Sequence, residues 1–470
     1  MMRALVLALC LAPALAAAGV RPSYGGTIRI GVGTAPRLGD GAQGPGDAFV
    51  ERATAAPLLE LDAAGALAPG ALAEVPLPEA GGRAFRLRLR PGLADASGRP
   101  LGAADVAARL AALLSPDAPS PDAWVALPVL GADALAERRA SLLAGVQVLS
   151  PTELLVTLAF PLPEFPWLLA AAPLALRGAG PFVAQPRRAP QDPLVLVRND
   201  RHHLGRPFAD EVRVVAVDPR GAARLVEQGG LDLVLRPEAA GGRAGPVLRA
   251  LAATVALVNP ARLGPGADAA RSALRALDRT ELARRFVRGP AEPLRTLVPP
   301  AILPGAPHDD APPAVGAALP ARLALLADSS APDQRALAER IQVKLFDRGI
   351  RASVDLADGG RFRARLAAGD YDVALLVVPV QAVRPALAAG QIAFAARGAR
   401  AARRTMAALA GLEGDDALAA AARVARELDL VPLVASGVRA SPAAALQGLA
   451  PRPDGAIDAG ALWLLRRGAP

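Results

Sequence analysis

Side chains that commonly do catalytic chemistry are scarce in this 470-residue chain. His202 and His203 are adjacent, His308 lies in a proline-rich stretch, and Cys10 is the single cysteine. A metal site needs ligands that converge from helix or loop spacings, whereas an adjacent histidine pair is more typical of a polar surface. The chain also lacks the Gly-x-Ser-x-Gly, P-loop and His-Glu-x-x-His patterns. We therefore expect no catalytic residue, no metal site and no cofactor.

The sequence favours a binding function over a catalytic one, because several arginines lie in an interval without carboxylates. No Asp or Glu stands between Asp372 and Glu413. The interval contains five arginines: Arg384, Arg397, Arg400, Arg403 and Arg404. A guanidinium binds carboxylate or phosphate groups through two parallel hydrogen bonds, so the interval is consistent with an anion-binding surface. The alternative interpretation is a solvated helix face.

Composition limits the class of protein. Hydrophobic residues make up 52% of the chain and charged residues 21%, which is typical of a globular protein. A chain of this length favours two or more lobes over one core. The net charge of +9 comes almost entirely from scattered arginines, with Lys344 the only lysine, and aromatic residues are only 3%. Nucleic-acid-binding proteins usually cluster their charge and add stacking aromatics, so we expect no nucleic-acid partner.

The N-terminus predicts export. A positive start at Arg3, an apolar run over 4–15 and small residues at 16–19 are typical of a cleaved signal peptide, with cleavage near Ala18. Later segments lack the ~20 continuous apolar residues of a membrane span, so we expect a soluble periplasmic protein. The alternative is a lipid anchor at Cys10, although the preceding Leu7–Leu9 is a poor lipoprotein box.

Periodicity predicts an α/β fold. Alternating strands are expected at 27–32 and in a hairpin over 146–165, and a strand–helix–strand unit over 212–235. Residues 321–378 continue with three strands separated by two helices, the last strand being of the fully buried type. This alternation favours parallel strands with helices on their faces.

Several ordered segments carry a family resemblance. FRLRLRPGLADASGRPLGAADVAARLAALL (85–114) resembles the strand, Asp-Gly-x-Pro turn and Ala-x-Asp-Val helix of the family 5 extracellular solute-binding proteins. Further segments are similar to that family in the same order: 24–36, 48–72, 146–165, 178–183, 194–217, 268–289 and 448–465. The chain is thus identified as a divergent member of this family of peptide- and nickel-type receptors of ABC importers.

The resemblance implies a two-lobed, type II-like periplasmic-binding-protein fold with a subdomain inserted in lobe I. After the signal peptide expected at 1–18, it places lobe I at 22–255, the subdomain at about 45–175, lobe II at 257–435 and a C-terminal return to lobe I at 436–470. The segments near 253–260 and 431–440 are expected to be the two crossings between lobes. A monomer working with an ABC permease in the inner membrane is implied, and no enzymatic activity.

The resemblance also implies that a peptide or other small solute binds between the lobes. In peptide-binding members a Gly-Trp…Asp-Pro pattern follows the strand at 372–378, and its acid holds the ligand's amino group. Residues 377–400 of this chain have neither the tryptophan nor the acid, which favours an anionic ligand. The candidate ligand-binding residues are Arg37, Asp40, Trp124, Trp167, Gln381 and Arg384. The alternative function is a divergent member that no longer transports and acts in signalling or interaction.

Overall fold

The computed structural model describes residues 21–39, 41, 44–62, 64–237, 245–305, 322–331 and 333–465. The expected signal peptide with Cys10, the candidate Asp40 and His308 lie outside these residues. Within the described part of the chain, no helix combines the length and hydropathy needed to cross a membrane.

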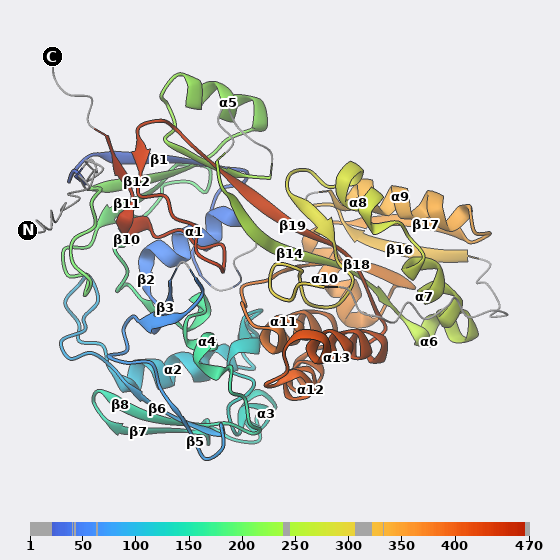
Figure 1. Cartoon of the computed structure of the whole chain (residues 1–470), viewed down its shortest axis with the longest axis horizontal. Coiled ribbons are helices and arrows are strands. Elements are labelled where there is room, and N and C mark those ends of the chain that lie inside the picture. Colours follow the sequence, from blue (N-terminus) through green and yellow to red (C-terminus); the bar gives the residue numbers. More distant parts are fainter. Residues whose placement is uncertain are drawn as a thin grey trace, which may run out of the picture.

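Two long antiparallel strands join the two halves of the molecule. β14 (Val247–Val258) and β19 (Leu430–Pro442) pair with each other and run from the left half to the right half in Figure 1. On the left, β13 pairs with β19; on the right, β18 pairs with β14. We call the left half lobe I and the right half lobe II. The paired strands therefore provide the two chain crossings.

The strands form one continuous sheet in the order β10-β11-β12-β1-β13-β19-β14-β18-β16-β17, with β15 beside β19. In lobe I, β1 lies between β12 and β13, parallel to both. In lobe II, β16 lies between β17 and β18, again parallel to both. The lobe I strands are β1 (Thr27–Val32), β10 (Phe182–Ala184), β11 (Leu194–Arg198), β12 (Glu211–Ala216) and β13 (Leu233–Arg236). The lobe II strands are β15 (Ala291–Pro293), β16 (Arg322–Asp328), β17 (Arg351–Ala357) and β18 (Val373–Pro379).

Helices cover both faces of the lobe II sheet. Val373 and Leu375 of β18 belong to a core formed with the helices α7 to α9, whereas Ala374, Leu376 and Val378 contribute to a core on the other face. This double burial explains the uninterrupted apolar sequence of β18, since successive side chains point to opposite faces. The helices of lobe II are α6 (Pro260–Leu263), α7 (Ala267–Arg275), α8 (Arg279–Phe286), α9 (Gln334–Phe346), α10 (Gly359–Ala368), α11 (Pro385–Arg397), α12 (Ala399–Leu409) and α13 (Gly414–Glu427).

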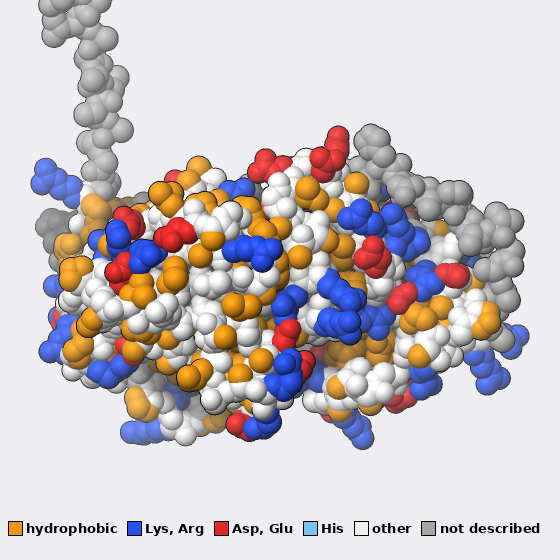
Figure 2. Space-filling model, turned by 90° about the horizontal axis from the view of Figure 1, so that it is seen from below, with side chains coloured by type: hydrophobic (Ala, Val, Ile, Leu, Met, Phe, Trp, Pro, Cys, Tyr) orange, Lys and Arg blue, Asp and Glu red, His pale blue; other side chains and the backbone are white. Residues whose placement is uncertain are grey.

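Viewed from the side of α12 and α13, the surface scatters its hydrophobic side chains among polar and charged ones (Figure 2). Beneath that surface α11 and α12 approach closely. A Cβ placed on Gly390 of α11 would lie 2.4 Å from Cγ of Met406, which is fully buried in α12. Glycine at this position allows the two helices to pack closely against each other.

The subdomain lies below lobe I in the view of Figure 1. Its four-stranded antiparallel sheet has the order β5-β6-β8-β7. The strands are β5 (Pro78–Glu79), β6 (Ala84–Arg88), β7 (Val146–Ser150) and β8 (Glu153–Thr157). Its helices are α2 (Ala103–Leu113), α3 (Ala132–Ala136) and α4 (Phe165–Leu169), with a short 3-10 turn, η1, at Ala123–Val125.

The remaining elements complete lobe I. The C-terminal segment returns there, because Phe208 donates its backbone N–H to Gly460 and Ser23 donates its hydroxyl to Leu464. The helices are α1 (Pro45–Thr54) and α5 (Pro219–Glu227), with 3-10 turns η2 (Ala172–Leu174) and η4 (Ala459–Ala461). The short strand pairs are β2 (Ala55–Ala56) with β9 (Leu176–Arg177), β3 (Leu59–Leu61) with β4 (Leu67–Pro69), and β20 (Leu446–Gln447) with β21 (Trp463–Leu464).

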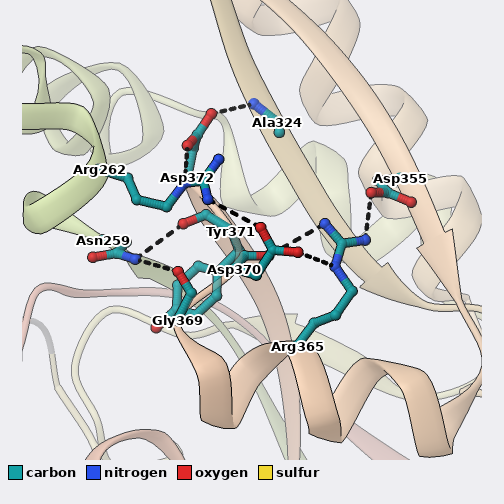
Figure 3. A network of polar contacts seen from close by, with 9 residues as sticks. All are labelled: Asn259, Arg262, Ala324, Asp355, Arg365, Gly369, Asp370, Tyr371 and Asp372. Carbon is teal, nitrogen blue, oxygen red and sulfur yellow. Dashed lines mark hydrogen bonds and ion pairs between the residues drawn. The ribbon is translucent and has the colours of Figure 1, made fainter.

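A polar network anchors the amino end of β18 (Figure 3). The Asn259 amide, at the end of β14, donates to the carbonyl oxygens of Gly369 (2.9 Å) and Tyr371 (3.1 Å). Asp372 accepts from the backbone N–H of Ala324 in β16 at 2.8 Å and from Arg262 at 3.1 Å. These contacts fix β18 against both of its neighbours. The carboxyl end of β18 is positioned by the same contacts, and the candidate residues Gln381 and Arg384 follow it.

Candidate functional site

The subdomain packs directly against lobe II along a surface that we call the seam, formed by η1, α4 and the 159–164 loop on one side and α11 to α13 on the other. One buried apolar cluster runs across it, from Phe85 and Trp124 to Leu387 and Met406. Trp124 is 1% exposed, and η1 contacts both α11 and α12. The two lobes therefore meet away from the β14–β19 connection as well.

Two candidate residues meet face to face at the seam. The guanidinium carbon of Arg384 lies 3.9 Å from the centre of the Trp167 indole ring. Trp167 belongs to α4 of the subdomain, and Arg384 is the residue immediately before α11 of lobe II. Stacking uses only the flat face of a guanidinium, so its N–H groups remain available to an anion. Among the described residues, no carboxylate pairs with Arg384.

Gln381 lies on the same loop as Arg384. Gln391 of α11 holds this loop: its amide accepts from the backbone N–H of Gln381 at 3.0 Å and donates to the carbonyl of Pro379 at 2.8 Å. The Gln381 side-chain oxygen is itself buried and has no hydrogen-bond donor among the described residues. A rigid backbone thus presents a side-chain acceptor that is still unused.

Other polar atoms at the seam are likewise unused. Nε1 of Trp124, Nε1 of Trp167 and Oε2 of Glu164 are buried without a partner among the described residues. Leaving a buried donor or acceptor unpaired costs about 1–3 kcal/mol, and such groups are uncommon in native proteins. The seam therefore holds several polar atoms that could still bind polar groups of another molecule.

Polar contacts among the described residues also join the subdomain to lobe II, at the seam and beside it. Arg403 of α12 forms an ion pair with Asp133 of α3, and burial lowers the pKa of Arg403. The other oxygen of Glu164 accepts from the backbone N–H of Gly411 at 2.7 Å. Sequence reasoning missed Asp133, Glu164 and Gly411, since no motif marks them and their partners are more than two hundred residues away.

The remaining candidates lie elsewhere or outside the described residues. Arg37 follows β1 and stands beside α1: its backbone N–H donates to Asp47 at 2.8 Å, while its guanidinium is exposed at 4.0 Å from the other oxygen. Asp40 is not among the described residues. Thus Trp167 and Arg384 contact each other, and Gln381 lies three residues before Arg384 on the same loop. Trp124 is buried in the apolar cluster of the seam, and Arg37 contacts Asp47 instead.

The adjacent histidines are not at the seam. His202 and His203 lie in lobe I with ring centres 4.7 Å apart, and Nδ1 of His202 contacts the carbonyl of Ala179 at 2.9 Å. Burial lowers the pKa of both, that of His203 to about 4. Within the described ranges, no three His, Cys, Asp or Glu residues group as metal ligands.

The fold matches solved structures of solute-binding proteins. The Escherichia coli murein tripeptide binding protein MppA superposes with a TM-score of 0.74 at 17% identity, covering 94% of this chain and 99% of that one. The binding protein AgaA from A. tumefaciens R10, in complex with agropinic acid, gives 0.74 at 17%, covering 93% and 99%. The unliganded open form of MppA fits less well, with a TM-score of 0.65 at 16% identity and coverages of 93% and 97%.

The α/β, two-lobed fold predicted from the sequence is confirmed by these superpositions. No curated protein matches the chain. The profile of the bacterial extracellular solute-binding proteins, family 5 (middle region), matches residues 68–382, which is more than half of the sequence. This is a family of substrate-binding receptors and not of enzymes. The chain therefore belongs to family 5 of the bacterial extracellular solute-binding proteins.

Proposed function

We propose that this protein is the periplasmic receptor of an ABC importer and that it encloses a small carboxylate-bearing solute beside the Trp167–Arg384 pair. The observation that carries the proposal is this pair, in which a cation without a carboxylate partner among the described residues stacks on an indole across the two lobes. A ligand carboxylate binds the free edge of the guanidinium while its flat face stays on the ring.

The neighbouring unused groups support the same site. The Trp167 indole N–H can donate to a ligand oxygen, and the Gln381 side-chain oxygen can accept from a ligand hydroxyl or amide. A few aimed polar groups in an apolar surrounding are typical of small-molecule sites. The ligand of the AgaA structure is also named as an acid, agropinic acid. The free amino group of a peptide has no acid to bind in the 373–412 interval.

The domain division belongs to the same proposal: lobe I over 22–255 with the subdomain at about 45–175, lobe II over 257–435, and the C-terminal return from 436. Cleavage of the 1–18 signal releases a monomer into the periplasm, and closure of the lobes on the solute presents both lobes to a permease. Strands β14 and β19 act as the hinge, since they alone extend the sheet from one lobe to the other among the described strands.

Titration calorimetry tests the ligand class. Succinate, as a dicarboxylate, and trialanine amide, as a cationic peptide without a carboxylate, are titrated into wild type and Arg384→Ala. We expect the carboxylate to bind and Arg384→Ala to weaken it by about 1–3 kcal/mol, the cost of losing a charged hydrogen-bond partner. Arg335→Ala, an exposed arginine on α9, is the matched control and should bind as wild type. Tight binding of the cationic peptide, unaffected by Arg384→Ala, would refute the assignment.

A second function has one observation in its favour. The seam is already filled by the protein's own side chains, with Arg384 covering the Trp167 face. A member that has lost transport and acts through its surface would have such a filled seam. A thermal-shift screen of carboxylates, phosphorylated solutes and peptides separates the two, because a bound ligand raises apparent stability by mass action. No shift with any solute class favours the interaction protein.

A further inference from the structure

A separate groove lies on lobe II between α12 and the carboxyl end of α13. Its volume is about 260 Å³. Three arginines, a threonine and one acid line it, together with apolar residues: Arg397, Arg400, Ala401, Arg404, Thr405, Ala408, Val424, Glu427 and Leu428. Neither Arg384 nor Trp167 nor Gln381 contributes to this lining. The groove is therefore distinct from the proposed solute site at the seam.

Two of the three arginines form no ion pair among the described residues. Arg400 and Arg404 are exposed, stand one helical turn apart on α12, and have no carboxylate partner among the described residues. Like charges at this spacing repel each other and destabilise a helix slightly. The third arginine, Arg397, already donates to the carbonyls of Leu428 (3.0 Å) and Val258 (2.9 Å). Because its N–H groups are used by these carbonyls, Arg400 and Arg404 are left for an incoming group.

The acid in the lining does not neutralise this pair. Glu427 lies at the end of α13, 3.8 Å from Arg423 on the same helix. Its charge is thus shared with an arginine outside the lining. The groove therefore retains a surplus of positive charge.

Further basic residues surround the groove. Asp429 is shared between Arg397 and Arg271. Burial lowers the pKa of the next arginine along α7, Arg275, and the positive charges of Arg271 and Arg426 lower it further. Lys and Arg side chains gather near the middle of the face seen from the side of α12 and α13 (Figure 2). The local field therefore attracts anions.

We propose that this groove binds a phosphate group, held by Arg400 and Arg404 beside Thr405. Two unpaired guanidinium groups match the charge of about −1.5 to −2 that a phosphate monoester carries at neutral pH, and each matches its oxygens with parallel N–H groups. The groove is larger than a phosphate alone requires, and its apolar wall of Ala408, Val424 and Leu428 suits the organic part that bears the phosphate. A soluble phosphate ester and a lipid headgroup share this chemistry.

The test compares two double variants that remove the same charge at the same spacing. Arg400→Gln/Arg404→Gln removes the two unpaired positive charges from the groove. Arg220→Gln/Arg224→Gln, on α5, is the matched control, since these arginines are also exposed and one turn apart but lie in lobe I. Circular dichroism and thermal melting confirm that both variants fold. The probes are glycerol 3-phosphate in calorimetry and phosphatidylglycerol vesicles in sedimentation, with phosphatidylcholine vesicles as the neutral reference.

We expect saturable, salt-sensitive binding of at least one phosphate probe to wild type. Loss of two charged contacts should weaken it about tenfold or more in the Arg400/Arg404 variant and leave it unchanged in the control. Binding of glycerol 3-phosphate identifies a soluble ester; binding confined to phosphatidylglycerol vesicles identifies a headgroup; either supports the site. Binding to neither probe, or equal loss in both double variants, overturns it.

The Arg384→Ala variant distinguishes phosphate binding in the groove from binding at the proposed solute site. The groove predicts that Arg384→Ala binds the phosphate probe as wild type does. If Arg384→Ala alone abolishes that binding, the phosphate enters the seam and the groove proposal is wrong, while the solute-receptor proposal stands. If the groove binds phosphate but no carboxylate binds at the seam, the groove proposal stands and the solute-receptor proposal is wrong.

Discussion

The ion pair between Arg403 and Asp133 offers a way to test the proposed closure of the lobes. It joins α12 of lobe II to α3 of the subdomain, so it exists only while these parts are together. The side chains are 24% and 42% exposed. A pair at this exposure contributes about 0.2–1 kcal/mol. Reversing one charge replaces the attraction with a repulsion of similar size, a total of about 0.5–2 kcal/mol.

The predicted consequence is a shift from closed to open. A change of about 0.5–2 kcal/mol alters the ratio of closed to open molecules by about 2- to 30-fold. Small-angle X-ray scattering of the ligand-free protein should therefore give a larger radius of gyration for Arg403→Glu and for Asp133→Arg than for wild type. The double variant Arg403→Glu/Asp133→Arg restores an attractive pair and should return the radius towards the wild-type value.

A matched control is available inside the subdomain. Arg138 pairs with Asp117, and both belong to the subdomain, so Arg138→Glu changes the same net charge without touching the seam. Its radius of gyration should equal that of wild type. High salt should shrink the effect of Arg403→Glu, because a partly exposed pair is screened. The reasoning is refuted if Arg403→Glu scatters as wild type does, or if the double variant is as open as the singles.

Three further predictions concern stability and the hinge. Asn259→Ala leaves one buried and one half-buried carbonyl without their donor and should lower the free energy of unfolding by about 1–3 kcal/mol in urea denaturation. Gly289→Ala should raise the open fraction in scattering, because φ is +84° there and a Cβ would lie 2.3 Å from the Pro237 carbonyl oxygen of lobe I. The pKa of His203 is lowered to about 4, chiefly by burial. Between its ordinary value of 6.5 and pH 4, only the unfolded ring gains a proton, so stability falls as pH falls. His203→Gln should remove about 1–2 kcal/mol of that fall, a figure reduced for the ring's partial exposure.

Much of the fold could be predicted because it depends on local periodicity. The uninterrupted apolar sequence of β18 predicts a strand buried on both faces, and it lies between β14 and β16 with helices on each side. Asp218 and Pro219 predict a helix start, and Asp218 accepts from the N–H groups of Arg220 and Gly221. Local caps can fail, however. Asp268 is a residue type that often caps helices, but it lies inside the first turn of α7, because a short 3-10 turn precedes that helix.

The seam could be predicted only in part, because its contacts join distant segments. Trp167 and Arg384 were each expected at the ligand site from the family resemblance, but their stacking depends on how the subdomain meets lobe II. The Glu164–Gly411 contact spans 247 positions of sequence. A single sequence contains no periodicity or spacing that connects such residues, so Glu164 could not have been singled out.

The five arginines of the carboxylate-free interval show why composition alone left two interpretations open. Arg384 precedes α11 and reaches the subdomain, whereas Arg397 ends that helix and bonds to backbone carbonyls. On α12, Arg400 and Arg404 share one side because they are four residues apart, and the adjacent Arg403 points about 100° away, towards Asp133. A basic interval therefore divides by helical phase into a surface pair and a cross-lobe contact. Composition alone cannot assign these roles, because they depend on the helical phase of each arginine.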